Sequence, residues 1–229
     1  MNEKPASTTG RIWGTATRTF SPAEVVADGI VHGVGLTIAT SMGAILLSFA
    51  ALETAPQELP ALAVYVASLL GVLAISLAFN LSPVSPVKEV LGRLDQAAIF
   101  LLIAGTYTPF LAAIGATPSG TLMVTLVWGG SLVGIALKLI VPRQFGRMAI
   151  LLYLAIGWSG VLVFQTLAAT LPATTLWLLV AGGLTYSAGI VFHLWERLRF
   201  QNVLWHCFVV AGATLHLWAI LDCMVLSRL

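Results

Sequence analysis

Seven apolar segments divide this 229-residue chain, and they constrain its fold more than any other feature of the sequence. A membrane-spanning helix needs roughly 20 consecutive, mostly apolar residues, and each segment is long enough to supply them. Only 9% of the residues are charged, whereas a soluble domain usually carries about a quarter, so most of the surface must face lipid. The segments cover residues 25–52, 62–81, 95–114, 122–141, 148–171, 175–194 and 203–225.

The segments are separated by short connections rich in proline and glycine, which stop helices. Pro83 and Pro86 stand in the second connection, and Pro118 in the third. The sequence therefore predicts an all-α fold with one seven-helix membrane domain over residues 21–229. A polar tail over residues 1–20 precedes that domain, and the length leaves no room for a separate soluble domain.

The basic residues lie on one side of this predicted bundle. Ten of the eleven lysines and arginines fall in or beside the N-terminal tail and the second, fourth and sixth connections, and Arg228 falls on the other side. Basic residues mark the cytoplasmic side of a membrane protein. We therefore predict a cytoplasmic N-terminus and a C-terminus outside. The net charge of +2 gives no reason to expect a nucleic-acid partner, and the expected partners are membrane lipids.

Polar side chains are costly inside membrane helices, so they tend to face the bundle interior and to mark function. They gather here at the predicted cytoplasmic ends of five segments, and one more lies about 15 Å deeper along the last segment. The residues at the ends are Glu24, Asp28, His32, Ser76, Asn80, Asp95, Gln96, His193, Asn202 and His206, and the deeper one is His216. A bundle could bring them into one pocket.

Carboxylates and imidazoles gathered at one depth indicate either a metal site or a proton-handling network. The alternative interpretation is that each residue merely sits in the wet membrane interface. Asp95 argues against that alternative, because an apolar run follows it immediately. His206 argues against it as well, since Trp205 and Cys207 flank it.

Three stretches of the chain resemble one family. The run RLDQAAIFLLIAGTYTPF over residues 93–110 closely resembles the helix-3 signature of bacterial hemolysin III proteins, which belong to the progestin and adipoQ receptor superfamily. The run LWHCFVVAG over residues 204–212 resembles their helix-7 motif. The stripe of Glu24, Asp28 and His32 resembles their helix-1 motif, in which asparagine often takes the middle place. The resemblance covers about residues 21–221 and implies a multi-pass protein of the bacterial inner membrane.

The resemblance also implies a zinc site. The family pattern takes one histidine from a Ser-x-x-x-His motif in helix 2 and two from a His-x-x-x-His motif in helix 7, while the helix-3 aspartate holds a zinc-bound water. This chain keeps Ser76, Asp95 and His206, but Asn80 and Asn202 stand where the pattern has histidine. Asparagine is a poor zinc ligand, so the expected metal ligands are His206 and Asp95.

Several arrangements of this altered pocket remain open. His193 or His32 could join His206 and Asp95 as substitute zinc ligands. A harder cation could instead bind Asp28, Asp95 and the two asparagines. In a metal-free pocket, Asn80, Asn202 and Gln96 would hydrogen-bond one another.

The preferred function is a hemolysin III-like membrane protein with a degenerate metal site. It would be sensory, structural or ligand-binding, with a lipid or small molecule as ligand. The alternative is a metal-dependent lipid amide hydrolase with Asp95 and Ser76 as catalytic residues, since some family members are credited with that reaction. An ion pathway is disfavoured, because the fourth and fifth segments are almost wholly apolar.

Overall fold

The computed structural model describes residues 20–53, 58–141 and 146–228, and these ranges hold helices and no strand. The predicted all-α class is therefore confirmed. The tail over residues 1–19 and Arg143 in the fourth connection lie outside the described residues. The main helices are α1 (Pro22–Glu53), α2 (Leu59–Leu81), α3 (Pro86–Ile114), α4 (Pro118–Ile140), α5 (Gly146–Gly157), α6 (Phe164–Thr170), α7 (Ala173–Leu194) and α8 (Gln201–Met224).

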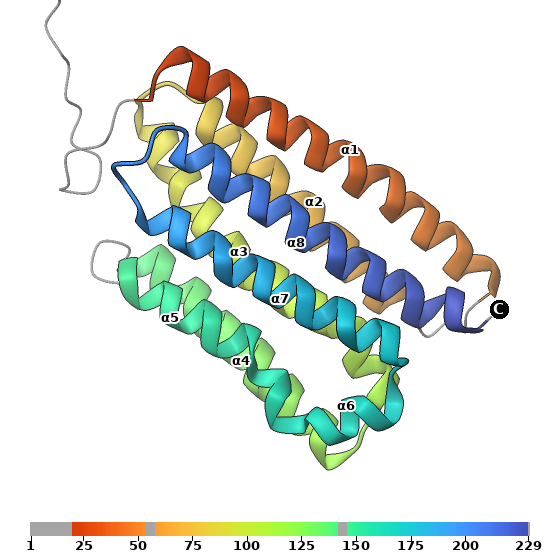
Figure 1. Ribbon diagram of the computed structural model, residues 1–229. Coiled ribbons are helices and arrows are strands. Elements are labelled where there is room, and N and C mark those ends of the chain that lie inside the picture. Colours follow the sequence, from red (N-terminus) through yellow and green to blue (C-terminus); the bar gives the residue numbers. More distant parts are fainter. Residues whose placement is uncertain (1–19, 54–57, 142–145, 229) are drawn as a thin grey trace, which may run out of the picture.

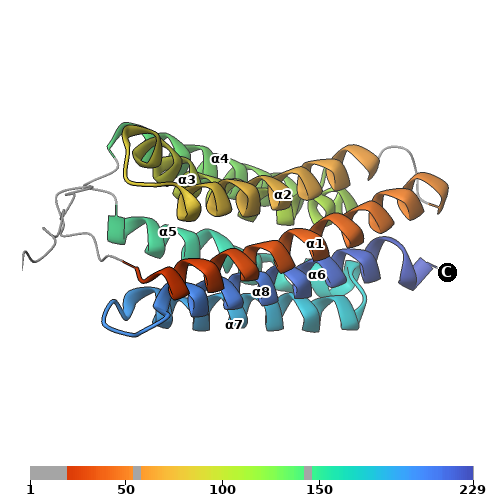
Figure 2. The ribbon, with the colours of Figure 1, turned by 90° about the horizontal axis from the view of Figure 1, so that it is seen from above.

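Seven stretches of these helices are long and apolar enough to cross a membrane, as the sequence predicts. The fifth stretch, Met148–Thr170, combines α5, a 3₁₀ segment called η2 (Ser159–Val163) and α6. The helices run up and down, so that the start of α1 and the α2–α3 and α7–α8 connections meet at one end (Figure 1). The C-terminus lies at the opposite end in both ribbon views (Figure 2).

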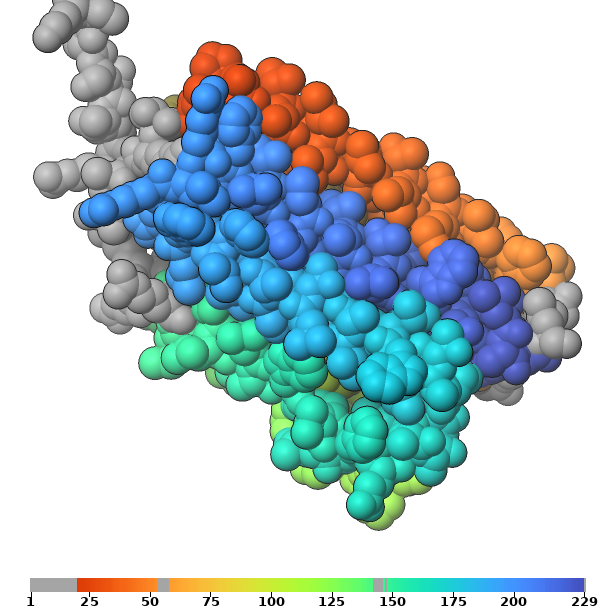
Figure 3. Space-filling model, viewed as in Figure 1, coloured from red at the N-terminus to blue at the C-terminus, as the bar shows by residue number. Residues whose placement is uncertain are grey.

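α1 packs against α2 and α8, and α8 packs against α7. Figure 3 shows α1, α8 and α7 side by side along the length of the bundle. α3 packs between α2 and α4 and supplies residues to both hydrophobic cores, with Leu102 in the first core and Phe100 in the second. The polar ends of α1, α2, α3 and α8 are therefore held at one end of the molecule.

Two exposed tryptophans mark the ends of α7. Trp177 is 74% exposed and Trp195 is 54% exposed. They stand 18 residues apart, which is about 27 Å along a helix. That separation is close to the roughly 30 Å thickness of the hydrocarbon core, and tryptophan is enriched at both membrane–water interfaces. The pair fits a bundle that spans a bilayer.

α3 begins nine residues earlier than the predicted start at Asp95. Pro86 occupies the first turn, and the side chain of Ser85 caps the helix by accepting a hydrogen bond of 3.2 Å from the Lys88 amide. Serine at the cap and proline just inside the helix are favourable starting residues. Asp95 therefore lies roughly two and a half turns inside α3 rather than at its opening.

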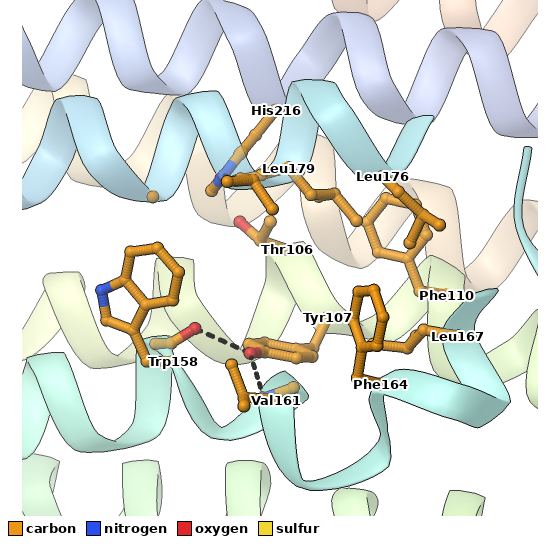
Figure 4. Close-up of a pocket in the computed structure, with 14 residues that line it drawn as sticks. Thr106, Tyr107, Phe110, Trp158, Val161, Phe164, Leu167, Leu176, Leu179 and His216 are labelled. Carbon is orange, nitrogen blue, oxygen red and sulfur yellow. Dashed lines mark hydrogen bonds between the residues drawn. The ribbon is translucent and has the colours of Figure 1, made fainter. Parts of the chain in front are cut away.

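The predicted fifth helix is not continuous. The Tyr107 hydroxyl of α3 donates to the Gly157 carbonyl at 2.7 Å and accepts from the Gly160 amide at 3.0 Å (Figure 4). A side chain inserted into the backbone ladder is a known cause of helix breaks. The 3₁₀ segment η2 begins between these two glycines, at Ser159.

Replacing Tyr107 with phenylalanine should destabilise the bundle by about 1–3 kcal/mol, because the substitution leaves two backbone groups without their partner. The measurement is the unfolding temperature of the detergent-solubilised protein. Tyr65→Phe is the matched control, since the Tyr65 hydroxyl is buried and has no hydrogen-bond partner among the described residues. An unchanged unfolding temperature for Tyr107→Phe would show that the break does not depend on this hydroxyl.

Candidate metal centre

One acidic and one basic side chain of α1 face α8, near the end of the bundle where both helices begin. Asp28 and His32 stand four residues apart, which places them on one face of α1. They are 3% and 1% exposed, and His206 of α8, beside them, is 7% exposed. The packing of α1 against α8 therefore buries a carboxylate and two imidazoles together.

These three side chains are in direct contact. The His206 Nδ1 atom lies 2.6 Å from Asp28 Oδ1. The His32 Nδ1 atom lies 2.9 Å from the Asp28 main-chain oxygen and 3.6 Å from Asp28 Oδ2. The two rings are edge to face, with centroids 4.3 Å apart. Asp28 thus contacts both imidazoles, His206 through its carboxylate and His32 mainly through its main-chain oxygen.

The group of Asp28, His32 and His206 could hold a metal ion. Each residue offers one ligand atom, and these atoms all lie within 4.8 Å of one another. Asp28 Oδ2 is buried and has no hydrogen-bond partner in the part of the chain that the structure describes. A buried polar atom without a partner is unusual and calls for a ligand, and two imidazoles with one carboxylate form a typical zinc donor set.

Ser76 and Asp95 lie on the far side of His206. The His206 Nε2 atom is 3.5 Å from the Ser76 hydroxyl, and Ser76 is buried on α2. The Asp95 carboxyl interacts with the Ser76 hydroxyl and with the His206 ring. The two residues predicted as catalytic therefore adjoin one predicted metal ligand, while His32 and Asp28 adjoin that ligand on its other nitrogen.

Asn80 and Asn202 bond to each other. The Asn202 side-chain amide donates to Asn80 Oδ1 at 2.9 Å, which joins α8 to α2. The Asn80 amide donates to the main-chain oxygen of Ser76 at 2.9 Å and lies 3.4 Å from its hydroxyl. This is the pairing that the metal-free arrangement requires of the two asparagines.

Gln96 and His193 are directed elsewhere. Gln96 accepts a hydrogen bond from Lys138 of α4 instead of joining the asparagines. His193 lies at the end of α7, where its ring packs on Trp205 with centroids 4.9 Å apart. Of the two substitute ligands that the sequence suggests, the structure places His32 beside His206, and His193 is not in the group.

Glu24 and His216 lie away from the metal group. Glu24 accepts hydrogen bonds from Ser21 at the start of α1 and from the Phe200 amide. His216 lies deeper on α8, where its Nε2 atom is 3.2 Å from the Leu179 main-chain oxygen. The polar residues thus form several adjoining clusters instead of the single pocket expected from the sequence.

Lys138 lies beside the site as well, although the sequence indicated for it only a place among the basic residues near the fourth connection. It is 2% exposed, and its ammonium group bonds to Gln96, the neighbour of Asp95. The Tyr153 hydroxyl donates to the main-chain oxygen of Gln96 at 2.7 Å. The sequence feature that could have identified Lys138 is its place inside an apolar segment, because charged residues there usually face the bundle interior and serve function.

Comparison with known proteins agrees with this architecture. The family profile described as "Haemolysin-III related" matches residues 21–217. The chain belongs to this family. Hemolysin-3 of Bacillus cereus is 32% identical over 198 residues, covering 86% of this chain and 90% of the relative. The Hemolysin-3 homolog of Bacillus subtilis (strain 168) is 30% identical over 202 residues, covering 88% of this chain and 95% of the relative.

A more distant relative is human. The human monocyte to macrophage differentiation factor is 28% identical over 127 residues, covering 55% of this chain and 52% of the relative. The resemblance to the hemolysin III family that the motifs indicated is therefore confirmed. The chain is a seven-span membrane protein of that family, and Asp28, His32 and His206 could hold a metal ion in it.

This hemolysin III protein also has an apolar cavity, distant from the metal group. It lies between α3, the break in the fifth span, α7 and one residue of α8 (Figure 4). Tyr107, Trp158 and Phe164 supply aromatic walls, and His216 borders the cavity on the α8 side. His216 stands ten residues from His206, which is about 15 Å along α8.

Proposed function

We propose that this hemolysin III protein binds zinc through Asp28, His32 and His206 and serves as a sensory or ligand-binding protein of the bacterial inner membrane. One observation carries the proposal: three buried residues offer donor atoms that lie within 4.8 Å of one another, and the second oxygen of Asp28 has no hydrogen-bond partner among the described residues. Three protein ligands leave a coordination position open for a ligand, as in other zinc sites with three protein donors.

The chemistry of the donors favours zinc over a hard cation. Imidazole suits zinc and related transition metals, whereas magnesium and calcium prefer sets made of oxygen atoms. The hydrogen bond between His206 and Asp28 stands where a metal would bind, so an ion would replace the shared proton. Asn80 and Asn202 satisfy each other and contribute no ligand to this set.

The orientation and the ligand are part of the same proposal. The basic residues of the N-terminal tail and of the even-numbered connections support a cytoplasmic N-terminus, which puts the metal group near the cytoplasmic leaflet. The apolar cavity beside Tyr107 and Trp158 supports a lipid or another apolar small molecule as the ligand, because its walls are aromatic and aliphatic.

A second candidate function is hydrolysis of a lipid amide. It is favoured by the Ser76 hydroxyl, which lies 3.5 Å from His206 Nε2, and by the Asp95 carboxyl, which interacts with that hydroxyl and electrostatically with His206. A bound zinc ion would supply Lewis acidity at this place. Asp95 would accept a proton from the attacking water, and the Ser76 hydroxyl would donate a hydrogen bond to the substrate oxygen. Turnover of a ceramide analogue that Asp95→Asn abolishes, with zinc content unchanged, would favour this candidate.

The proposal predicts about one zinc ion per chain in protein purified without chelator, measured by elemental analysis. His206→Ala should lose the metal, because it removes one of three ligands. His216→Ala is the matched control on the same helix, since His216 bonds to the Leu179 main chain and lies outside the group. Zinc well below one per chain in the wild type, with His206→Ala no different, would refute the proposal.

A further inference from the structure

All three candidate ligands come from two helices. Asp28 and His32 lie on α1, and His206 lies on α8. Their spacing therefore depends on how α1 is placed along and against α8. The distances that a metal accepts from its ligands vary by only about 0.2 Å, so a small slip between the two helices would disrupt the set. A group that ties the two helix starts together would control the site.

Glu24 links the two helix starts by hydrogen bonds. Its Oε2 atom accepts hydrogen bonds of 2.9 Å from the amide and from the hydroxyl of Ser21, and the Ser21 hydroxyl accepts from the Glu24 amide at 3.3 Å. This reciprocal pair is a capping box, which caps the N-terminal end of α1. The other carboxylate oxygen of Glu24, Oε1, accepts a hydrogen bond of 2.9 Å from the amide of Phe200, which stands 176 residues further along the chain.

Phe200 is the residue that starts α8. It is the N-cap of that helix, and its φ of 59° is in the left-handed region. Glycine apart, no other described residue has a positive φ. Such a conformation persists only where surrounding contacts hold it. The hydrogen bond that the Phe200 amide donates to Glu24 is a contact of this kind, because it fixes this amide from another helix.

We propose that Glu24 is a positioning residue that fixes the start of α8 against α1 and thereby sets the spacing of Asp28, His32 and His206. The inference rests on the proposed metal function. Glu24 stands one turn before Asp28 on the same face of α1, and it is 6% exposed. Phe200 stands six residues before His206, which is about 9 Å along α8. One carboxylate thus links the two segments that carry the ligands.

The test uses the full-length protein in detergent with Co²⁺ as the metal probe. Glu24→Ala should weaken Co²⁺ binding by about 10-fold or more, which is the usual effect of removing a group that orients metal ligands. It should also change the visible absorption of the bound Co²⁺, because that absorption depends on the coordination geometry. Glu24→Gln should restore part of both, since its amide oxygen can still accept from the Phe200 amide.

Ser21→Ala is the matched control, because it removes the two hydrogen bonds of the α1 cap that use the Ser21 hydroxyl and leaves the bond from the Phe200 amide to Glu24. It should bind Co²⁺ with nearly wild-type affinity and spectrum. Hydrogen exchange without metal gives a second readout: the Phe200 amide should exchange fastest in Glu24→Ala, at an intermediate rate in Glu24→Gln and slowest in Ser21→Ala. Unchanged exchange in both Glu24 variants would overturn the inference, even if one variant folds poorly.

The outcomes separate the two proposals. Wild-type Co²⁺ affinity and spectrum in Glu24→Ala would overturn the positioning role and leave the metal function standing. Failure of the wild-type protein to bind Co²⁺ would remove the metal function itself and the positioning role that rests on it. Equal losses in Ser21→Ala and Glu24→Ala would show that only the helix cap matters, which also overturns the inference.

Discussion

Replacing Asp28 with asparagine will weaken zinc binding by about 100-fold or more. Asparagine keeps the size of the side chain and one oxygen acceptor for His206, so the contact at 2.6 Å survives in an uncharged form. The negative charge between His32 and His206 is lost, and a neutral amide is a poor zinc ligand. The substitution therefore tests the charge of Asp28 separately from its shape.

The measurement is competition of the purified protein against a chelator of known zinc affinity. Asp222→Asn is the matched control, because it makes the same chemical change at the opposite end of α8, where Asp222 accepts a hydrogen bond of 2.6 Å from Thr175. The control should keep wild-type zinc affinity. If Asp28→Asn and the wild type compete equally well, Asp28 is not a ligand and the metal must be held elsewhere.

Replacing Asn80 and Asn202 together with histidine should strengthen zinc binding by about 10-fold or more, since it adds imidazoles in place of amides. The two side chains already touch each other across α2 and α8, and Asn80 touches Ser76, whose hydroxyl lies 3.5 Å from His206. New imidazoles at these places would stand beside His206 and restore the histidine pattern that the family resemblance implies.

The decisive version combines the double substitution with His32→Ala. In the wild type, loss of His32 should remove zinc, because His32 is one of the three proposed ligands. In the double variant, the same loss should be tolerated, since the new histidines form a set with His206. Elemental analysis of the purified variants gives the result. Zinc that still depends on His32 in the double variant would show that the asparagine positions no longer face the metal.

Much of the fold could be predicted from the sequence because lipid imposes simple rules on it. Seven apolar segments are long enough to cross a bilayer, and this predicted the number of spans. Prolines such as Pro118 indicated where helices start. The predictions were wrong where one side chain changed the local backbone. Ser85 and Pro86 start α3 nine residues early, and Tyr107 breaks the fifth span from another helix.

The site was harder to predict, because its geometry depends on how helices rotate against one another. Spacing alone put Asp28 and His32 on one face of α1, but it did not show that this face meets His206. His193 and His32 were equally good candidates in the sequence. The packing of α1 against α8 brings His32 to the group, while the ring of His193 packs on Trp205.

The broken fifth span also bears on how the protein enters the membrane. In its broken form, that span needs a partner for the Gly157 carbonyl and the Gly160 amide, because unsatisfied backbone groups are costly in hydrocarbon. Their partner, Tyr107, belongs to a helix that the ribosome makes about 50 residues earlier. The order of synthesis therefore has the tyrosine already in place when the fifth span arrives, and we expect the break to form as that span packs against α3.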